Sequence, residues 1–255
     1  MGILTLEVII GLSLAGVFAG FINTIAGGGS LLTLPALLLA GLPPDVANGT
    51  NRVGVLFQAT SATFAFRGSG HLKSLPLPWI TLPTLLGAGA GAFVASRTPN
   101  EILEPILLGS MVVMAIVLAA KKSILIPGTN EEAVHPRKNR KALFGLLLAG
   151  FYGGFVQAGL GFLLLAVFGG MLRLDLIRAN SVKAVTVLCL TLLALSIFIA
   201  SGHVQWAPGL VLAIAGIVGA RLGANFAMKI PPNVLRIVVL VTVTSASLWL
   251  LLRHS

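Results

Sequence analysis

The sequence predicts an all-α integral membrane protein with two inverted-topology repeats, each holding a broken, re-entrant helical hairpin plus three transmembrane helices. Three observations support this prediction: the composition, the recurrence of long apolar runs and an internal duplication. Hydrophobic residues make up 56% of the chain and charged residues 9%, and the mean hydropathy is +1.01. Because soluble domains carry about 25% charged residues, the composition excludes a soluble protein.

Apolar runs occupy nearly the whole chain and predict its helices in order. They lie at roughly 3–25, 31–41, 46–66, 76–96 and 101–120, and again at roughly 142–158, 160–172, 176–201, 207–228 and 233–252. A helix needs about 20 residues to cross a bilayer, so 31–41 and 160–172 are too short to cross. The first run lacks the basic start and cleavage site of a signal peptide, and we expect it to be retained.

Between the two sets of runs lies a polar, basic stretch that predicts a solvated linker. It holds six cations: Lys121, Lys122, Arg137, Lys138, Arg140 and Lys141. The predicted organisation is therefore a first transmembrane repeat at 1–120, a linker at 121–141 and a second transmembrane repeat at 142–255.

The two sets of runs are copies of one another. Leu14-Ala-Gly, Phe21-Ile-Asn23 and Gly27 match Leu148-Ala-Gly, Phe155-Val-Gln157 and Gly161 at an offset of 134. Later matches have an offset of 132, among them Ala47-Asn48 with Ala179-Asn180 and Gly70-His71 with Gly202-His203. A single deletion of two residues reconciles the offsets, so we interpret the pattern as an internal duplication.

The distribution of Lys and Arg predicts the orientation. Cytoplasmic loops carry an excess of these residues. With the linker in the cytoplasm and inverted repeats, twelve cations fall inside: the six of the linker and Arg67, Lys73, Arg173, Arg178, Lys229 and Arg236. Only Arg97 and Arg253 then fall outside, whereas parallel repeats would leave nine inside. The counts favour inverted repeats and a cytoplasmic linker.

Four pairs of glycines recur at a spacing of four residues. They are Gly16–Gly20, Gly87–Gly91, Gly150–Gly154 and Gly219–Gly223. This spacing places small residues on one helix face, where two helix backbones can approach closely. We therefore expect these faces to be packing surfaces.

A helix break at Phe21–Ser30 and its counterpart at Phe155–Gly161 predict a site for an anion. The short run 31–41 reaches about halfway across a ~30 Å core, which puts its N-terminus near the midplane. Two opposed helix N-termini with free N–H groups favour an anion. The candidate residues are Asn23, Thr24, Gly27, Gly28, Gly29, Ser30, Gln157, Gly159 and Gly161. The alternative is that the glycines only let the helices bend and pack.

Cations inside apolar runs are a second sign of an anion site. A charge at the centre of a membrane costs at least ~2.5–3.5 kcal/mol, so it suggests a function. Arg52 and Lys183 lie in corresponding runs, with Asn48, Asn51 and Asn180 close to them in sequence. The alternatives are that these cations, and Arg221, extend toward the headgroups, and that Asn48 caps its helix.

The apolar runs contain no acids away from their ends and no catalytic or metal-binding motif, which disfavours several other classes of function. All seven acids fall in loops or at segment ends, which disfavours cation transport and a carboxylate proton relay. No metal-ligand or nucleophile–base spacing stands out, so we expect neither an enzyme nor a metal or other cofactor. The lone Cys189 forms no internal disulfide. The net charge of +10 reflects cytoplasmic loops, and no nucleic-acid partner is expected.

Two stretches resemble the paired signatures of the TauE/SafE family of sulfite exporters, also called the toluene-sulfonate uptake permease family. The first is Ala19-Gly-Phe-Ile-Asn-Thr-Ile-Ala-Gly-Gly-Gly-Ser30 and its continuation to Ala47-Asn-Gly-Thr-Asn-Arg52. The second is Gly150-Phe-Tyr-Gly-Gly-Phe-Val-Gln-Ala-Gly-Leu-Gly161 with Arg178-Ala-Asn-Ser-Val-Lys183. The resemblance implies a multi-pass carrier, and specifically an exporter, of small sulfur-containing anions such as sulfite or organosulfonates in a bacterial cytoplasmic membrane.

The favoured hypothesis is therefore a carrier whose substrate lies at the midplane between the two breaks. The alternatives are a channel-like anion pore and a membrane subunit that passes sulfur species to a partner enzyme. The expected partners are a small anion and the lipid bilayer, and a homodimer is left open.

Overall fold

The computed structural model describes residues 4–25, 27–67, 76–120 and 133–226, and within these ranges the regular elements are all helices. The first repeat contains α1 (Leu6–Ile25), α2 (Ser30–Leu39), α3 (Pro44–Arg67), α4 (Leu77–Ala95) and α5 (Asn100–Ala120). The second contains α6 (Arg140–Phe155), α7 (Leu160–Leu165), α8 (Leu176–Ala200) and α9 (Trp206–Phe226). The expected segment 233–252, His71 and most of the linker lie outside the described residues.

The helices agree with the apolar runs to within a few residues at each end. Two short helical turns complete the second repeat: a 3₁₀ turn at Pro136–Lys138 and a π-helical turn at Ala166–Met171, which extends α7. The short runs 31–41 and 160–172 are indeed two short helices, each following a break. The long run 142–158 stops early, because the chain leaves the helix at Val156 to form the second break.

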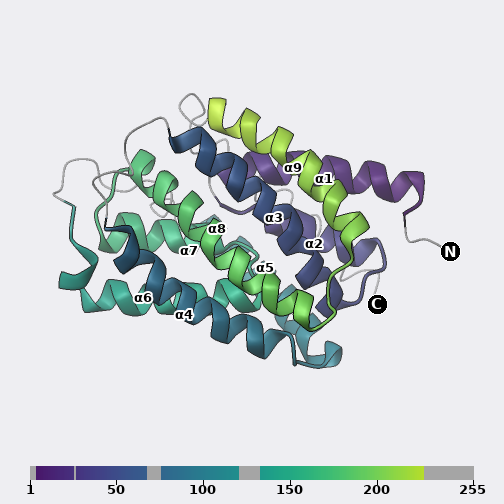
Figure 1. Cartoon of the computed structure of the whole chain (residues 1–255), viewed down its shortest axis with the longest axis horizontal. Coiled ribbons are helices and arrows are strands. Elements are labelled where there is room, and N and C mark those ends of the chain that lie inside the picture. The colour runs from purple at the N-terminus through teal and green to yellow at the C-terminus, as the bar shows by residue number, and fades with distance from the viewer. Residues whose placement is uncertain (1–3, 26, 68–75, 121–132, 227–255) are drawn as a thin grey trace.

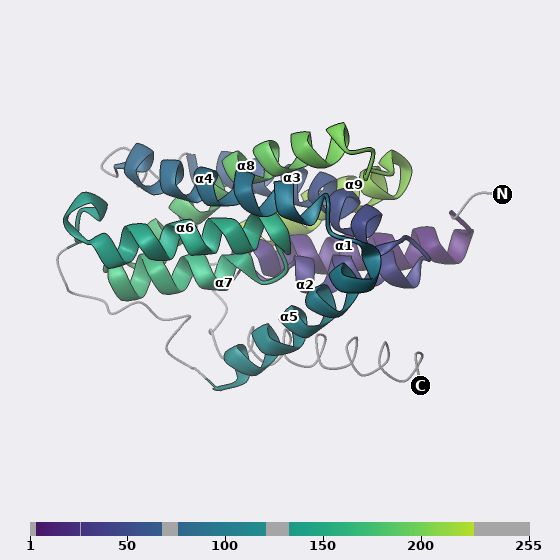
Figure 2. The ribbon, with the colours of Figure 1, turned by 90° about the horizontal axis from the view of Figure 1, so that it is seen from below.

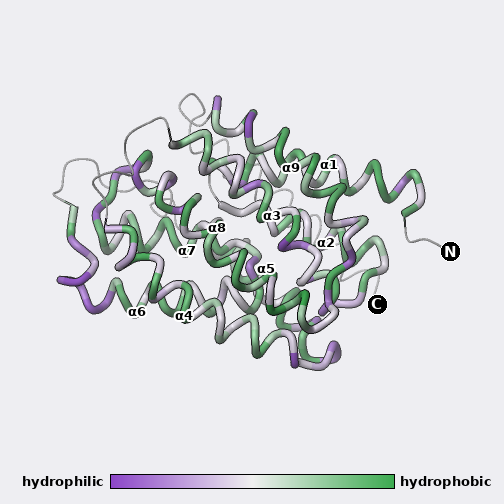
Figure 3. The backbone as a smooth tube through the Cα atoms, in the orientation of Figure 1, coloured by the Kyte–Doolittle hydropathy of each residue, from purple (hydrophilic) through white to green (hydrophobic). Residues whose placement is uncertain are grey.

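Four helices in the described part of the chain are long and apolar enough to cross a membrane: α1, α4, most of α8 and most of α9. Their outer faces carry large apolar side chains, and Leu14, Phe18 and Ile214 are each more than half exposed. Figure 3 shows mainly apolar residues in the middle of these helices and polar residues toward some of their ends. An apolar exterior suits a protein that lies in lipid, as the composition predicted.

Helices of the two repeats pair with one another. The α1 helix packs along α9, and α4 packs along α6, so each pair joins one helix from each repeat. The long helices α3 and α8 contact each other and both pairs. Figure 2 shows α5 crossing below the other helices at an angle.

The glycine faces make these pairs possible, as the spacing predicted. An ideal Cβ on Gly20 of α1 would lie 2.2 Å from the Gly216 carbonyl oxygen of α9. A Cβ on Gly154 of α6 would lie 2.0 Å from the Ala88 carbonyl oxygen of α4. Carbon and oxygen cannot approach this closely, so any larger side chain would separate the helices.

Contacts along the helices fix their directions. Gly209 packs on Val53 and Gly216 packs on Gln58, so α9 runs parallel to α3. The start of α3 lies by the end of α8, because Phe198 contacts Gly49. The other end of α3 shares a cavity with the start of α8, where Ala62 and Ala184 both line the wall. The helices α3 and α8, which occupy equivalent places in the two predicted repeats, are thus antiparallel.

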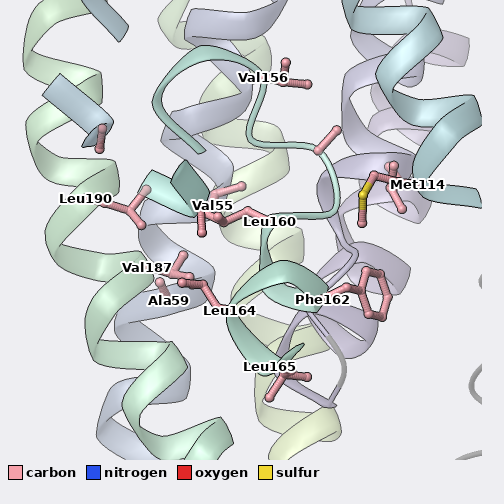
Figure 4. Close-up of a cluster of buried hydrophobic side chains, with 14 of the residues drawn as sticks. Val55, Ala59, Met114, Val156, Leu160, Phe162, Leu164, Leu165, Val187 and Leu190 are labelled. Atoms are coloured by element: carbon pink, nitrogen blue, oxygen red, sulfur yellow. The ribbon is translucent and has the colours of Figure 1, made fainter. Parts of the chain in front are cut away.

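The largest cluster of buried apolar side chains surrounds α7 and connects both repeats. Figure 4 shows Leu160 and Leu164 of α7 close to Val55 and Ala59 of α3 and to Val187 of α8. These side chains are almost fully buried. The cluster holds the second break against the central helices and thereby positions it next to the first break.

Candidate functional site

The two helix breaks touch through their backbones. The Gly161 N–H donates a hydrogen bond to the Gly27 carbonyl, with 3.0 Å between nitrogen and oxygen. An ideal Cβ on Gly161 would lie 2.2 Å from the Gly27 Cα, and a Cβ on Gly27 would lie 2.4 Å from the Gly161 Cα. Gly27 also has a φ of 91°, which other residues rarely adopt. We call this pair the glycine contact, and it requires glycine on both sides.

The helix starts beside the glycine contact differ from the expectation of free N–H groups. The Gly161 N–H is bonded to the first break, and the Leu31 and Leu32 N–H groups donate to the carbonyls of Gly28 and Gly29 at 3.0 Å. The reason is local, because the turn that begins α2 brings these carbonyls back toward the next N–H groups. These three donors are therefore bonded within the protein, although the helix dipoles remain.

A tight fit holds the residues of the first break in place. A Cβ on Gly29 would lie 2.4 Å from the Ala19 carbonyl oxygen of α1, and a Cβ on Gly28 would lie 2.4 Å from the Phe162 ring of α7. Ser30, the first residue of α2, is buried. The start of α2 thus lies beside α1 on one side and against α7 on the other.

Polar side chains of the two breaks bond to the central helices in matching ways. The Asn23 Nδ2 donates to Gln58 Oε1 of α3 at 3.1 Å, and the Gln157 Nε2 donates to Thr191 Oγ1 of α8 at 2.9 Å. Asn23 and Gln157 are equivalent in the duplication. Each break is therefore fixed by one hydrogen bond to the long helix of its own repeat.

Lys183 of α8 is buried, and its side chain reaches the C-terminal end of α1. Its Nζ donates to Asn180 Oδ1 at 2.6 Å and to the Thr24 carbonyl at 3.4 Å. The Thr24 hydroxyl donates in turn to the Gly20 carbonyl at 2.9 Å. We call Lys183, Asn180 and Thr24 the Lys183 cluster. Both acceptors are neutral oxygens, so the ammonium charge is not balanced by an acid within the cluster.

Arg52 of α3 is fully buried, and its guanidinium reaches the C-terminal end of α6. Its Nη1 donates to the Gly153 carbonyl at 3.0 Å and its Nη2 to the Gly154 carbonyl. The guanidinium carbon also lies 4.5 Å from the centre of the Phe198 ring. Asn48 accepts from Arg52 Nη2 at 3.4 Å and donates to the Phe155 carbonyl at 2.7 Å. We call Arg52, Asn48 and these three carbonyls the Arg52 cluster.

The two cations have corresponding roles on the two repeats. Arg52, from the first repeat, bonds the last carbonyls of α6, and Lys183, from the second, bonds a carbonyl near the end of α1. A cation at this end of a helix interacts favourably with its dipole and its unpaired carbonyls. Both side chains are buried, at 0% and 3% exposure, so extension toward the headgroups is wrong for both. Arg221, in contrast, is exposed.

A small cavity lies beside the Lys183 cluster. It is lined by Asn23, Thr24, Gln58, Lys183 and four apolar residues of α3 and α8, and it has room for about one water molecule. The Gln58 Nε2 is buried and has no hydrogen-bond partner. The cavity lining therefore includes a lysine and a glutamine whose amide has an unused donor, and no carboxylate.

The predicted site residues divide into separate groups. Asn23, Thr24 and Lys183 line the cavity, with Asn180 behind Lys183, whereas Arg52 and Asn48 form the other cluster at the end of α6. Asn51 accepts a hydrogen bond from the Thr33 hydroxyl of α2, and its Nδ2 is buried without a partner. Gly159, with a φ of 77°, packs against Met114 of α5. The candidate residues, which the sequence suggested as one site between the two breaks, thus form two clusters with the glycine contact as a third group.

Three residues of the site were not among the predicted ligands, although the sequence predicted that Gln58 shares the polar region of Arg52 and Lys183. Gln58 could be suspected because an amide in an apolar run needs a partner, and Thr191 lies in the corresponding part of α8. Phe198 gave no such signal, because its contact with Arg52 depends on the antiparallel packing of α3 and α8. The carbonyls of Gly153 and Gly154 could not be found from residue types at all.

The acids and metal-ligating side chains do not gather near these clusters. In the described ranges, no group of three or more His, Cys, Asp or Glu residues is placed to hold a metal ion. The ion pair between Asp45 and His203, with 3.3 Å between oxygen and nitrogen, joins the start of α3 to the loop before α9. It links the two repeats at the end of α3 opposite the cavity.

The profile of the family described as "Sulfite exporter TauE/SafE" matches residues 12–250. The match includes both breaks, both buried cations and the helices that hold them. The chain belongs to the TauE/SafE family.

Relatives of this TauE/SafE protein are similar along nearly their whole length. A probable membrane transporter protein of Haemophilus influenzae is 31% identical over 231 residues, which cover 89% of this chain and 88% of the relative. The "Probable membrane transporter protein ORF9" of a Sinorhizobium species is 29% identical and covers 92% and 89%. The Escherichia coli protein YfcA, also named a probable membrane transporter, is 29% identical and covers 90% and 85%. No solved structure matches this chain.

Proposed function

We propose that this TauE/SafE protein is a carrier that exports small oxyanions of sulfur, such as sulfite or organosulfonates, across the cytoplasmic membrane. The observation that carries the proposal is the Lys183 ammonium, which is buried beside a cavity and donates hydrogen bonds to the neutral oxygens of Thr24 and Asn180. A buried charge is costly unless a counter-charge is supplied. A bound anion would supply it, and this supports an anionic substrate.

The donors around the cavity suit an oxyanion in particular. Gln58 and Lys183 both line the cavity, and the Gln58 Nε2 has no hydrogen-bond partner. Hydrogen bonds from charged donors such as Lys183 to oxyanions are the stronger kind. Asn23 lies beside Gln58 and Lys183, and its amide can reorient from Gln58 toward a ligand. A sulfite or sulfonate group offers three oxygens to these three side chains.

The arrangement of the repeats supports a carrier mechanism. We infer inverted repeats from two observations. The helices α3 and α8 are antiparallel, and each of the pairs α1–α9 and α4–α6 joins one helix from each repeat. In such carriers one repeat rocks against the other around a central site. Because the cavity has room for about one water molecule, a sulfur oxyanion needs a rearrangement to enter. This favours a carrier over an open pore.

Uptake of radiolabelled sulfite into proteoliposomes tests the assignment. Lys183→Gln removes the charge at similar size, and we expect at least a tenfold loss of the initial rate. Arg97→Gln is the matched control, because Arg97 is an exposed cation at the end of α4, stacked over Phe93. Its rate should equal that of the unaltered protein. An unchanged rate in Lys183→Gln would remove Lys183 from the substrate site.

The same preparation separates the carrier from its alternatives. A carrier saturates with sulfite and accelerates in counterflow, when unlabelled sulfite is on the other side. A rate that rises without saturation would support a channel-like pore. Loss of all transport activity in the purified protein, together with co-purification of a soluble sulfurtransferase, would instead support a membrane subunit that passes sulfur to an enzyme.

A further inference from the structure

A groove on the outer surface between α3 and α9 lies apart from the proposed transport site. Its volume is about 320 Å³, and its walls are five residues of α3 between Phe57 and Ala65 together with Ile217 and Arg221 of α9. Phe57 is 39% exposed and Phe64 is 65% exposed. The groove thus has exposed aromatic rings at its rim, and one of its walls is α9, which is long and apolar enough to cross a membrane.

Arg221 is the one cation that lines this groove, and the nearby helices supply no acid to balance it. The described helices α3 and α9 contain a single acid, Asp45, at the start of α3. Because α3 runs parallel to α9, Asp45 lies at the end opposite Arg221. The neighbouring α1 also runs parallel to α9, and its only acid, Glu7, is likewise at the far end.

The chemistry of the groove suits one kind of molecule. An exposed guanidinium in a membrane span is stabilised by an anion, and its planar fork binds phosphate oxygens with two hydrogen bonds. Phe57, Phe64 and Ile217 present apolar surface of the sort that an acyl chain covers. A zwitterionic headgroup would bring a second cation close to Arg221, whereas an anionic headgroup would not.

We propose that this groove binds one anionic phospholipid, with the phosphate on Arg221 and an acyl chain along Phe57 and Phe64. Since α3 and α9 pack against each other and α3 also contributes Gln58 to the proposed transport site, the lipid would hold the outer faces of these two helices together. The proposal does not depend on the transported substrate.

Native mass spectrometry of the full-length protein, released from micelles with added lipid, tests this site. Phosphatidylglycerol and phosphatidylcholine are compared, with inorganic phosphate alone as a third arm. We expect the adduct with phosphatidylglycerol to fall at least fivefold in Arg221→Gln and in Ala65→Phe, which fills the groove with a ring. Arg97→Gln should retain the adduct, and thermal unfolding in detergent confirms that each variant is folded.

The three arms distinguish the outcomes. Equal retention of phosphatidylglycerol in Arg221→Gln and Arg97→Gln would overturn the proposal. Equal binding of phosphatidylglycerol and phosphatidylcholine, unchanged in both Arg221→Gln and Ala65→Phe, would also overturn it. Binding of inorganic phosphate that depends on Arg221 and is unaffected by Ala65→Phe would show a free-phosphate site and would also overturn the lipid assignment.

Discussion

At the scale of single residues, Arg52 and Lys183 occupy corresponding places and differ in how fully they are bonded. The guanidinium of Arg52 reaches two successive carbonyls and a ring face, which its planar fork suits. The ammonium of Lys183 bonds one amide oxygen and one distant carbonyl, and it borders a cavity. We therefore expect Arg52 to act mainly in stability and Lys183 mainly in transport.

This difference predicts opposite results for two substitutions. Arg52→Lys keeps the charge but cannot reach both the Gly153 and Gly154 carbonyls, so it should lower the free energy of unfolding by about 1.5–3 kcal/mol. Lys183→Gln should change that free energy by less, yet lose transport. Thermal unfolding in detergent and sulfite uptake, measured on the same samples, check the pair. A stable Arg52→Lys protein would show that the carbonyl contacts are dispensable.

The glycine contact gives a second prediction at this scale. Gly161→Ala places a methyl group 2.2 Å from the Gly27 Cα, so the breaks must separate, at a cost of about 1–3 kcal/mol. Gly170→Ala is the matched control, because nothing lies within 4 Å of a Cβ at that position in the turn that extends α7. We expect a lower melting temperature and weaker sulfite uptake only in Gly161→Ala. Equal behaviour of both variants would contradict a close backbone contact.

At the scale of helices, the pairs α1–α9 and α4–α6 depend on close backbone approach at glycine. In lipid, helices gain little from burying apolar surface against each other, because the acyl chains are equally apolar. Van der Waals contact between closely fitted backbones then holds them together. Both pairs show this close backbone contact, and each pair joins one helix from each predicted repeat.

Two glycines in the α4–α6 region separate packing from helix propensity. Gly154→Ala adds a Cβ 2.0 Å from the Ala88 carbonyl oxygen, so we expect the α4–α6 pair to loosen and the melting temperature to fall by several degrees. At Gly89 of α4 the nearest atom to a Cβ is a Leu193 methyl at 3.5 Å, an ordinary contact. Gly89→Ala should therefore be neutral or stabilising by up to ~1 kcal/mol. Circular dichroism during heating measures both.

At the scale of the whole molecule, the relative orientation of the two predicted repeats would determine how the proposed site opens. Antiparallel α3 and α8 give each repeat one end of the site: Arg52 contacts the end of α6, and Lys183 contacts the end of α1. If one repeat tilts against the other, these contacts can break on one side while the other side stays closed. On the proposed inverted arrangement, one set of contacts would supply two alternative states.

Cysteine labelling in cells tests this relation. With Cys189→Ala as background, Ser201→Cys at the end of α8 should react with a membrane-impermeant maleimide in intact cells. Lys138→Cys in the linker should react only after permeabilisation, since we place the linker in the cytoplasm. Both positions are exposed. Parallel repeats would put the end of α8 inside, so protection of Ser201→Cys in intact cells would contradict the inverted arrangement.

The sequence by itself determined which segments are helical, which two are short, and where the chain breaks. These features depend on local properties: the length of an apolar run, the spacing of glycines and the rarity of charge. The sequence also predicted the duplication, because matching residues such as Asn23 and Gln157 recur at an offset of 134 that a single two-residue deletion changes to 132. The family signatures lie in these same local motifs, which is why the resemblance was visible.

Only the tertiary structure decided which residues meet. Arg52 and Lys183 looked alike in the sequence, yet one bonds helix carbonyls at two points and the other borders a cavity. The N–H groups expected to face an anion include three that are bonded within the protein, because the breaks lie against each other at Gly27 and Gly161. Backbone carbonyls and close contacts carry no residue-type signal, so their place depends on how the repeats pack.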